Sequence, residues 1–282
     1  MKNSRKASFI AIAIIYVLAA ALGVLVYRVL PMDGVWLKLL IADVAATVFT
    51  FIFSLIFSNA SVYDPYWSVQ PIVIALGFFI NAKLTAASVL ALIAVLYWGI
   101  RLTANWAYTF KGLNHQDWRY TMLNEKTGAF YPLINFLGIH MFPTLVVYAC
   151  TLPVIEVIMN AYTLNALSVV FFVLSLFAAT LQLVADIQMQ SFRNAKIGGF
   201  IRKGLWKYSR HPNYLGEILI WWGMGLFAVS LVPDKWYLIT GAIVNTVMFL
   251  FVSIPMAEKR QSKKDGYATY KKETRMLLPI KI

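Results

Sequence analysis

Eight apolar stretches run through the chain and are separated by short polar connections. They cover residues 8–30, 36–59, 66–81, 84–104, 131–153, 164–190, 213–232 and 236–257. About 20 consecutive apolar residues are enough for a helix to cross a bilayer. Helices are the expected form because they satisfy their own backbone groups where lipid offers no partner. The pattern predicts an all-α polytopic membrane bundle of about eight transmembrane helices, in which the short stretch 66–81 could be re-entrant.

The charge distribution agrees with a membrane location. Only 13% of the 282 residues are charged, whereas soluble domains carry about 25%. Cytoplasmic connections collect Lys and Arg, and with the N-terminus inside, 21 of the 25 basic residues fall on inside segments. We therefore expect both termini to be cytoplasmic. The net charge of +13 then reflects topology and does not indicate a nucleic-acid partner.

The first stretch and the single cysteine narrow the picture further. Basic residues precede the first stretch and "LAAALG" resembles a signal cleavage site, but the apolar run continues to Leu30, so we expect a retained helix. Cys150 is the one cysteine and lies inside an apolar run. Neither a disulfide nor a metal centre is expected.

A polar stripe marks the end of the sixth stretch. Gln182, Asp186, Gln190 and Arg193 are spaced by four, four and three residues, so they share one helix face. Polar groups inside a span usually face a cavity or a partner helix. The stripe predicts either the wall of a polar ligand cavity or a set of inter-helix hydrogen bonds with an interfacial ion pair.

The segment "YSRHPNYLGEILIWWG" begins the seventh helix. Asn213 and Glu217 are four residues apart and share a face, and Pro212 suits a first helical turn. Arg210 and His211 stand beside the free N–H groups of that turn, which favours an anion such as a phosphate or a carboxylate. A lipid headgroup is the alternative occupant. The later "GMGLFA" fits GxGxxA, but inside an apolar helix its small residues indicate close helix packing.

Three other places hold polar groups near the membrane. Tyr97, Arg101 and Asn105 are spaced by four on the fourth stretch, with Trp98 beside them. They predict either part of the cavity or an aromatic belt with an arginine that sets topology. Asp64 precedes a proline in "YDPYW", where a helix break could aim the carboxyl inward. The basic tail from Glu258 onward is either an interfacial segment held by acidic lipids or a cover over a nucleotide bound by residues 191–212.

The spacing of these groups resembles a known family. The pattern "FR……GLWKYSRHPNYLGE", with an acid seven residues before its arginine, is similar to the C-terminal region of the steroid 5-alpha-reductases and their bacterial relatives. The resemblance covers roughly residues 60–282 and is strongest from Asp186 to Gly223. It implies a seven-helix core, here 59–282, that binds NADPH in a cytoplasm-facing cavity and follows N-terminal transmembrane helices at 1–58.

Asp186, Arg193, Tyr208, Asn213 and Glu217 fall on motif positions of that family, and Gln182 stands where the family has an amide. The family's catalytic acid is typically Glu, where this chain has Asp64. Its catalytic tyrosine lies three residues before an arginine, whereas Tyr97 lies four before Arg101. With Tyr97 and Asp64 as catalytic candidates, the resemblance implies reduction of a carbonyl-conjugated C=C bond in a lipid-soluble substrate. Predicted substrate-binding residues are Trp67, Trp98 and Arg101.

A second resemblance leaves the cofactor open. Membrane methyltransferases of isoprenylcysteine and phospholipids share RHP-x-Y and a later acid, which hold S-adenosylmethionine; Arg210, His211, Pro212 and Tyr214 match, with Glu258 as the acid. The predicted cofactor-binding set is Gln182, Asp186, Arg193, Tyr208, Arg210, His211, Asn213, Tyr214, Glu217, Glu258 and Arg260. We expect an NADPH-dependent reductase of a bacterial inner membrane. A methyltransferase and a non-enzymatic lipid-binding protein are the alternatives.

Overall fold

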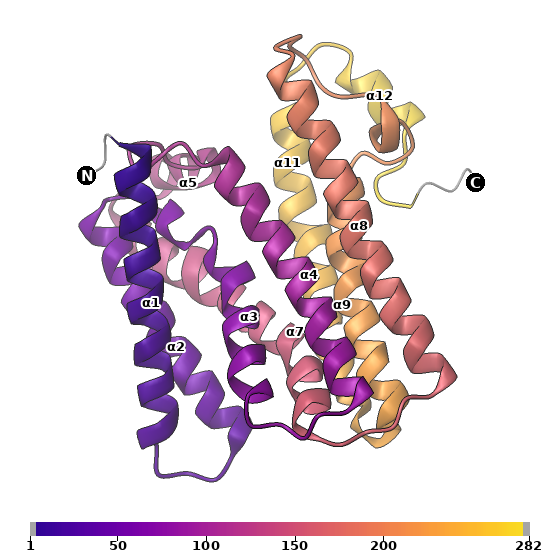
Figure 1. The fold of residues 1–282 in the computed structure, drawn as a ribbon. Coiled ribbons are helices and arrows are strands. Elements are labelled where there is room, and N and C mark those ends of the chain that lie inside the picture. Colours follow the sequence, from indigo (N-terminus) through magenta and orange to yellow (C-terminus); the bar gives the residue numbers. More distant parts are fainter. Residues whose placement is uncertain (1–3, 279–282) are drawn as a thin grey trace. The chain divides into compact units, whose positions relative to one another are not determined.

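The computed structural model describes residues 4–278, and this part of the chain is helical without a strand (Figure 1). It divides into two compact units. The first comprises Met1–Gly77 and Leu102–Leu152, and the second comprises Phe78–Arg101 and Pro153–Ile282. The predicted boundary at residue 58 stays a prediction, while the all-α bundle is confirmed.

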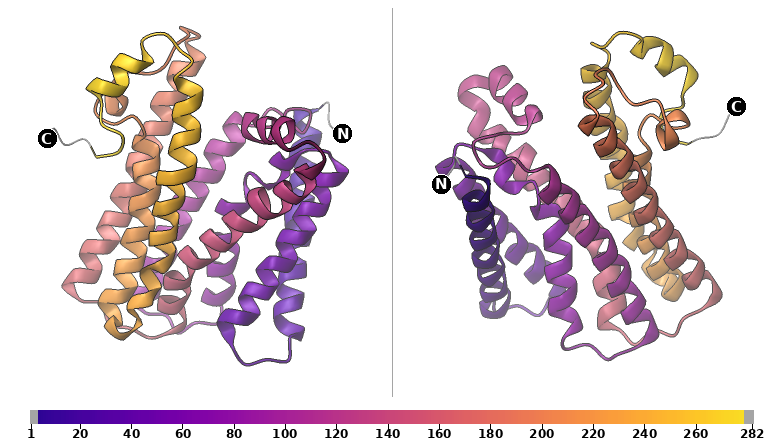
Figure 2. Two further views of the ribbon diagram at one scale, coloured as in Figure 1. Left: turned by 180° about the vertical axis from the view of Figure 1, so that it is seen from behind. Right: turned by 45° about the horizontal axis from the view of Figure 1, so that its top comes forward.

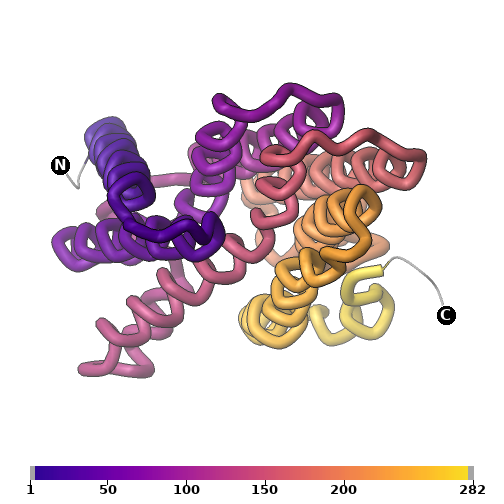
Figure 3. Tube along the Cα trace, turned by 90° about the horizontal axis from the view of Figure 1, so that it is seen from below, coloured from indigo at the N-terminus to yellow at the C-terminus, as the bar shows by residue number. Residues whose placement is uncertain are grey.

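Two long N-terminal helices, α1 (Arg5–Val29) and α2 (Val35–Ile56), pack side by side in the first unit, as the view in Figure 3 also shows. The Arg5 guanidinium donates to the carbonyl of Phe110 at 2.8 Å and so ties the start of α1 to a later segment. The unit also contains η1 (Ala60–Tyr63), α3 (Tyr66–Phe79), the end of α4 (Ala86–Thr109), α5 (Trp118–Thr127), η2 (Gly128–Phe130), α6 (Tyr131–Ile134), η3 (Asn135–Met141) and most of α7 (Phe142–Met159).

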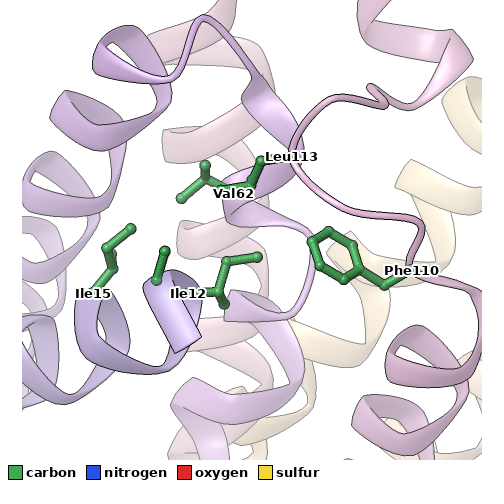
Figure 4. Close-up of a cluster of buried hydrophobic side chains, with 6 residues drawn as sticks. Ile12, Ile15, Val62, Phe110 and Leu113 are labelled. Atoms are coloured by element: carbon green, nitrogen blue, oxygen red, sulfur yellow. The ribbon is translucent and has the colours of Figure 1, made fainter. Parts of the chain in front are cut away.

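A small apolar cluster holds the start of α1 against η1 and the connection after α4. Its buried members converge in Figure 4 and are Ala11, Ile12, Ile15, Val62, Phe110 and Leu113. Burying a large aliphatic or aromatic side chain stabilises a fold by about 1.5–3 kcal/mol. This hydrophobic burial stabilises the part of the first unit where α1 begins.

The second unit is organised around α8 (Ala166–Asn194) and α9 (Pro212–Leu231), which lie side by side in both views of Figure 2. Asn165 and Ser168 form a capping box at the start of α8, and Pro212 occupies the first turn of α9 as predicted. The remaining helices are η4 (Gly204–Lys207), η5 (Pro233–Ile239), α10 (Thr240–Met248), η6 (Phe249–Ser253), α11 (Ile254–Gln261) and α12 (Tyr267–Glu273).

Seven helical segments in the described range are long and apolar enough to cross a membrane: Arg5–Val29, Val35–Ile56, Ala86–Thr109, Trp118–Met159, Ala166–Asn194, Pro212–Leu231 and Pro233–Gln261. The chain is therefore an integral membrane protein. The predicted stretch 66–81 forms α3, whose 14 residues extend about 21 Å. That length is below the ~30 Å of a bilayer core, so the expected count of eight is reduced to seven helices of crossing length.

Glycines let α8 and α9 approach closely. A Cβ atom added to Gly216 would lie 2.7 Å from the carbonyl oxygen of Ala178, and one added to Gly223 would lie 2.3 Å from the Ser175 hydroxyl. This confirms that "GMGLFA" lies within a helix and that its first glycine serves packing. The close approach also brings the polar face of α8 against α9.

We expect Gly216→Ala to destabilise the protein by about 1–3 kcal/mol, because a methyl group there overpacks the contact between α8 and α9. Thermal unfolding followed by tryptophan fluorescence measures the effect. Gly77→Ala is the control, because its new methyl group meets nothing within 4 Å and Ala is a better helix former than Gly. Equal melting temperatures for the two variants would contradict the packing argument.

Candidate functional site

The carboxylate of Glu217 is the buried centre of the polar groups in the second unit. Its side chain is almost fully enclosed, with a residue exposure of 3%. Oε2 accepts from the Trp98 indole at 2.9 Å and from the Gln182 amide at 2.8 Å, and Oε1 accepts from the Trp221 indole at 2.9 Å. Three neutral N–H donors from α4, α8 and α9 thus stabilise one carboxylate where lipid and water are excluded.

An ion pair lies beside this carboxylate. Arg101 on α4 donates to Asp186 on α8 at 3.0 Å, and the two side chains are 3% and 13% exposed. The charge of Arg101 also interacts with that of Glu217. Asp186 follows Gln182 by four residues, so one face of α8 supplies both groups, as the sequence predicted.

Three buried polar atoms of this cluster have no hydrogen-bond partner in the described part of the chain. They are Nε and Nη2 of Arg101 and Oε1 of Gln182. A carboxylate accepts only, so Glu217 requires the NH2 group of Gln182 and leaves the amide oxygen facing elsewhere. The cluster therefore offers two unused donors and one unused acceptor, and each such group needs a water or a ligand.

The cluster continues toward the end of α8. Asp186 interacts electrostatically with Arg193, which is exposed in the last turn of the helix. The two residues are seven positions apart, which corresponds to about 10 Å along the axis. Asn213 is half-buried in the first turn of α9, and Tyr208 is 59% exposed. Polar groups thus extend from a buried interior to an exposed helix end.

Arg210 and Glu258 form a second buried cluster. Arg210 Nε donates to Glu258 Oε1 at 2.7 Å, and further N–H groups donate to the backbone carbonyls of Lys271 and Thr274. The Lys271 ammonium lies 2.7 Å from the other carboxylate oxygen. Arg210 is therefore engaged by the C-terminal segment that follows α11.

His211 is enclosed beside this cluster. Its ring stacks on Tyr214 with centroids 5.2 Å apart, and Nε2 lies 3.4 Å from Glu258 Oε1. Burial lowers the pKa of His211 to about 4, although the Glu258 carboxylate acts in the opposite direction. His211 is consequently neutral at neutral pH, and it does not add a positive charge to the start of α9.

The C-terminal segment covers the connection from α8 to α9. The Tyr270 hydroxyl donates to the Trp206 carbonyl, Lys264 donates to the Gly199 carbonyl at 2.6 Å, and the Arg210 N–H donates to the Arg275 carbonyl at 2.8 Å. The tail therefore packs on that connection, while its two predicted roles, an interfacial segment held by acidic lipids or a cover over a nucleotide bound by residues 191–212, stay predictions. Arg260 is exposed at the end of α11.

The two catalytic candidates lie in different units. The half-buried Tyr97 in the second unit shares a hydrogen bond of 3.0 Å with Thr180. Asp64 in the first unit accepts from the Tyr120 hydroxyl at 2.7 Å. Burial raises the pKa of Asp64 to about 6, with the Arg119 guanidinium opposing the shift. Their joint role in catalysis stays a prediction.

The predicted substrate-binding residues have different surroundings. Trp67 is half-buried at the start of α3 in the first unit. Trp98 is 1% exposed and donates to Glu217, while Arg101 pairs with Asp186. Trp98 and Trp221 also meet edge to face with centroids 4.6 Å apart. Both Trp98 and Arg101 thus belong to the same polar cluster as the cofactor candidates of α8 and α9.

Sequence reasoning overlooked two buried acids. Asp43 lies inside α2 and accepts from Tyr66 and Gln70, and Glu156 pairs with Lys235 at 2.6 Å. Asp43 lies within the apolar stretch 36–59, and Glu156 lies three residues after the stretch 131–153, within α7. An acid at such a position is the signal that could have revealed each, because ionisable groups inside a span are rare and usually have a partner or a function.

Comparison with known proteins identifies relatives without an assigned activity. A family model described as protein of unknown function (DUF1295) matches residues 50–274. An uncharacterized protein of Schizosaccharomyces pombe (strain 972 / ATCC 24843) is 28% identical in an alignment of length 199 that covers 60% of this chain. The match spans 57% of the length of that relative. No solved structure matches.

We expect Arg210→Gln to release the C-terminal segment, because it leaves Glu258 buried without its main partner. Breaking a buried ion pair typically costs about 3–5 kcal/mol. Limited proteolysis should cleave residues 262–276 much faster in the variant than in the wild type. Arg202→Gln is the control: its pair with Glu273 is 48% and 56% exposed, and such surface pairs contribute about 0–1 kcal/mol. Equal cleavage rates for the two variants would show that Arg210 does not hold the segment.

Proposed function

The chain belongs to the DUF1295 family, and we propose that it is an NADPH-dependent reductase of a carbonyl-conjugated C=C bond in a lipid-soluble substrate. The observation that carries the proposal is the cluster of Glu217, Gln182, Asp186 and Arg101, buried in the second unit and continued by the exposed Arg193. If these side chains served only to pack the helices together, the buried polar atoms of Arg101 and Gln182 that have no partner would be unexplained.

These unused atoms fit the nicotinamide end of the cofactor. A carboxamide has one carbonyl acceptor and an NH2 donor, which complement the free N–H groups of Arg101 and the free Oε1 of Gln182. Glu217 serves as a positioning residue, because its hydrogen bond fixes which end of the Gln182 amide is free. Arg193, exposed at the end of α8, suits a phosphate of the cofactor.

The chain's own residues would supply orientation and protons, while bound NADPH supplies the hydride. Negative charge develops on the substrate carbonyl oxygen during such a reduction, and an aimed hydroxyl stabilises it. The Tyr97 hydroxyl, held by Thr180, is the proposed donor. Protonated Asp64 is the proposed acid. The substrate would enter laterally from the bilayer, and the cofactor from the cytoplasm of a bacterial cell.

The contacts of Arg210 favour the reductase over the methyltransferase. In the resemblance to the methyltransferases, Arg210 and Glu258 would bind S-adenosylmethionine. In this chain the guanidinium of Arg210 donates to Glu258 and to two backbone carbonyls of the C-terminal segment. By contrast, Nε and Nη2 of Arg101 and Oε1 of Gln182 have no partner among the described residues, as is also true of Nε2 of His211 in the shared RHP motif.

We expect purified protein in lipid nanodiscs to bind NADPH. Arg193→Ala and Asn213→Ala should each raise the dissociation constant for NADPH. Loss of a hydrogen bond to a charged group is worth about 1.5–3 kcal/mol, or roughly 10–100-fold. Equilibrium binding by NADPH fluorescence measures this. Lys83→Ala is the control, because it removes an exposed cation outside the predicted nucleotide-binding residues. Binding of S-adenosylmethionine in place of NADPH would establish the methyltransferase, and binding of neither would favour a non-enzymatic role.

We expect turnover to fall as pH rises through about 6, because Asp64 acts as an acid only while protonated and burial raises its pKa to about 6. NADPH oxidation against a panel of steroidal and long-chain enones gives the profile. Asp64→Asn should remove this pH dependence and lower kcat by roughly 100-fold, the usual size of general-acid catalysis. Tyr97→Phe should lower kcat but keep the profile. An unchanged profile in Asp64→Asn would assign the acid to another residue.

A further inference from the structure

Asp43 is an acidic group in the middle of a membrane-spanning helix. It follows the start of α2 by eight residues, or about 12 Å along the axis, and is 4% exposed. Among the described residues, no Lys, Arg or His nitrogen lies within salt-bridge distance of its carboxyl group. An ionised carboxylate without a cation is expensive at this depth, so a proton is the natural compensating charge.

Two side chains of α3 hold the carboxyl group. The Tyr66 hydroxyl lies 2.8 Å from Asp43 Oδ1, and the Gln70 amide nitrogen lies 2.8 Å from Oδ2. Gln70 Oε1 is buried and has no partner in the described part of the chain. An ionised Asp43 accepts from both groups, whereas a protonated Asp43 can donate its hydrogen to the Tyr66 oxygen.

Further hydroxyl groups lie next to Tyr66. Thr47 interacts with the Tyr66 hydroxyl, the Thr47 and Thr144 hydroxyls are 2.9 Å apart, and Thr144 lies 2.8 Å from the Tyr63 hydroxyl. Thr47 follows Asp43 by four residues, so both point from one face of α2. Each hydroxyl is both a donor and an acceptor. The chain of hydrogen bonds can therefore be polarised in either direction.

Tyr63, the last residue in this series of hydroxyl groups, lies beside a rare backbone feature. His140 lies in the π-helical segment η3, its ring centroid is 4.7 Å from that of Tyr63, and its Nδ1 lies 3.0 Å from the Asn135 carbonyl oxygen. Its Nε2 is buried without a partner in the described residues. Segments of this kind occur frequently at functional sites.

We propose that the first unit contains an intramembrane proton relay in which Asp43 stores the proton and the hydroxyls of Tyr66, Thr47, Thr144 and Tyr63 carry it. Asp43 gives its carboxyl hydrogen to the Tyr66 oxygen, and each hydroxyl in turn passes on its own hydrogen. A proton taken from water at one end is matched by one released at the other. Each hydroxyl keeps one hydrogen, and no electrons move.

The other titratable groups around Asp43 are three phenols and one imidazole. Those that pack near it or near Tyr66 from α1, η1, η3 and α7 are Tyr16, Tyr63, His140 and Tyr148. None supplies a permanent charge.

Infrared spectroscopy of the full chain in nanodiscs tests the relay without any cofactor. We expect the carbonyl band of a protonated carboxyl group that shifts on transfer to D2O and is lost in Asp43→Asn. Thr144→Val should slow the D2O shift by roughly tenfold or more, because it removes one hydrogen-bonded step, whereas Thr144→Ser should retain the wild-type rate.

Thr151→Val is the matched control. Thr151 is a buried threonine on the same helix, and its hydroxyl bonds only to the backbone carbonyl of Val147, at 2.7 Å, among the contacts described. An equal exchange rate in Thr144→Val and Thr151→Val overturns the relay. A band that Asp43→Asn does not remove overturns the role of Asp43.

Loss of the band when Na⁺ replaces N-methylglucamine at constant pH shows that Asp43 holds a cation instead. NADPH binding is unaffected by any of these outcomes, so they are separable from the proposed function.

Discussion

The buried carboxylate of Glu217 constrains the second unit more than any other group. Lipid supplies no hydrogen bonds, so its oxygens must find donors within the bundle. Trp98, Gln182 and Trp221 supply them from α4, α8 and α9. Removing one donor leaves an under-solvated charge, and such groups are costly. One carboxylate therefore constrains how α4, α8 and α9 are rotated about their axes. For the Gln182 amide to reach Glu217, α8 and α9 must lie close together, and their glycine contacts allow this.

This constraint also shapes the chemistry available nearby. Because Glu217 takes the NH2 group of Gln182, the amide oxygen is left as an acceptor, and because Asp186 takes one N–H group of Arg101, the others are left as donors. The same acids that hold the helices together thus leave a complementary donor and acceptor pair. Stability and a candidate ligand site arise from one set of hydrogen bonds.

Helix positions and the face shared by Gln182 and Asp186 could be predicted from the sequence, because hydropathy and four-residue spacing are local properties. The partners of Glu217 could not, because the choice of Trp98 depends on how α4 is rotated against α8 and α9. The length of α3 was visible in the short stretch 66–81, but the π-helical segment at Asn135–Met141 left no pattern in the residues. Asp43 was visible as an acid within a span, and only its contacts show that it has no basic partner among the described residues.

The two units handle an intramembrane acid in opposite ways. In the second unit Asp186 is paired with Arg101, a permanent cation that favours the ionised carboxylate. In the first unit the hydrogen-bond partners of the Asp43 carboxyl group among the described residues are Tyr66 and Gln70, whose contacts suit an ionised or a protonated carboxyl group. A paired acid can organise a bound polar ligand but cannot readily exchange protons. An unpaired acid at the end of a series of hydroxyl groups is suited to exchange.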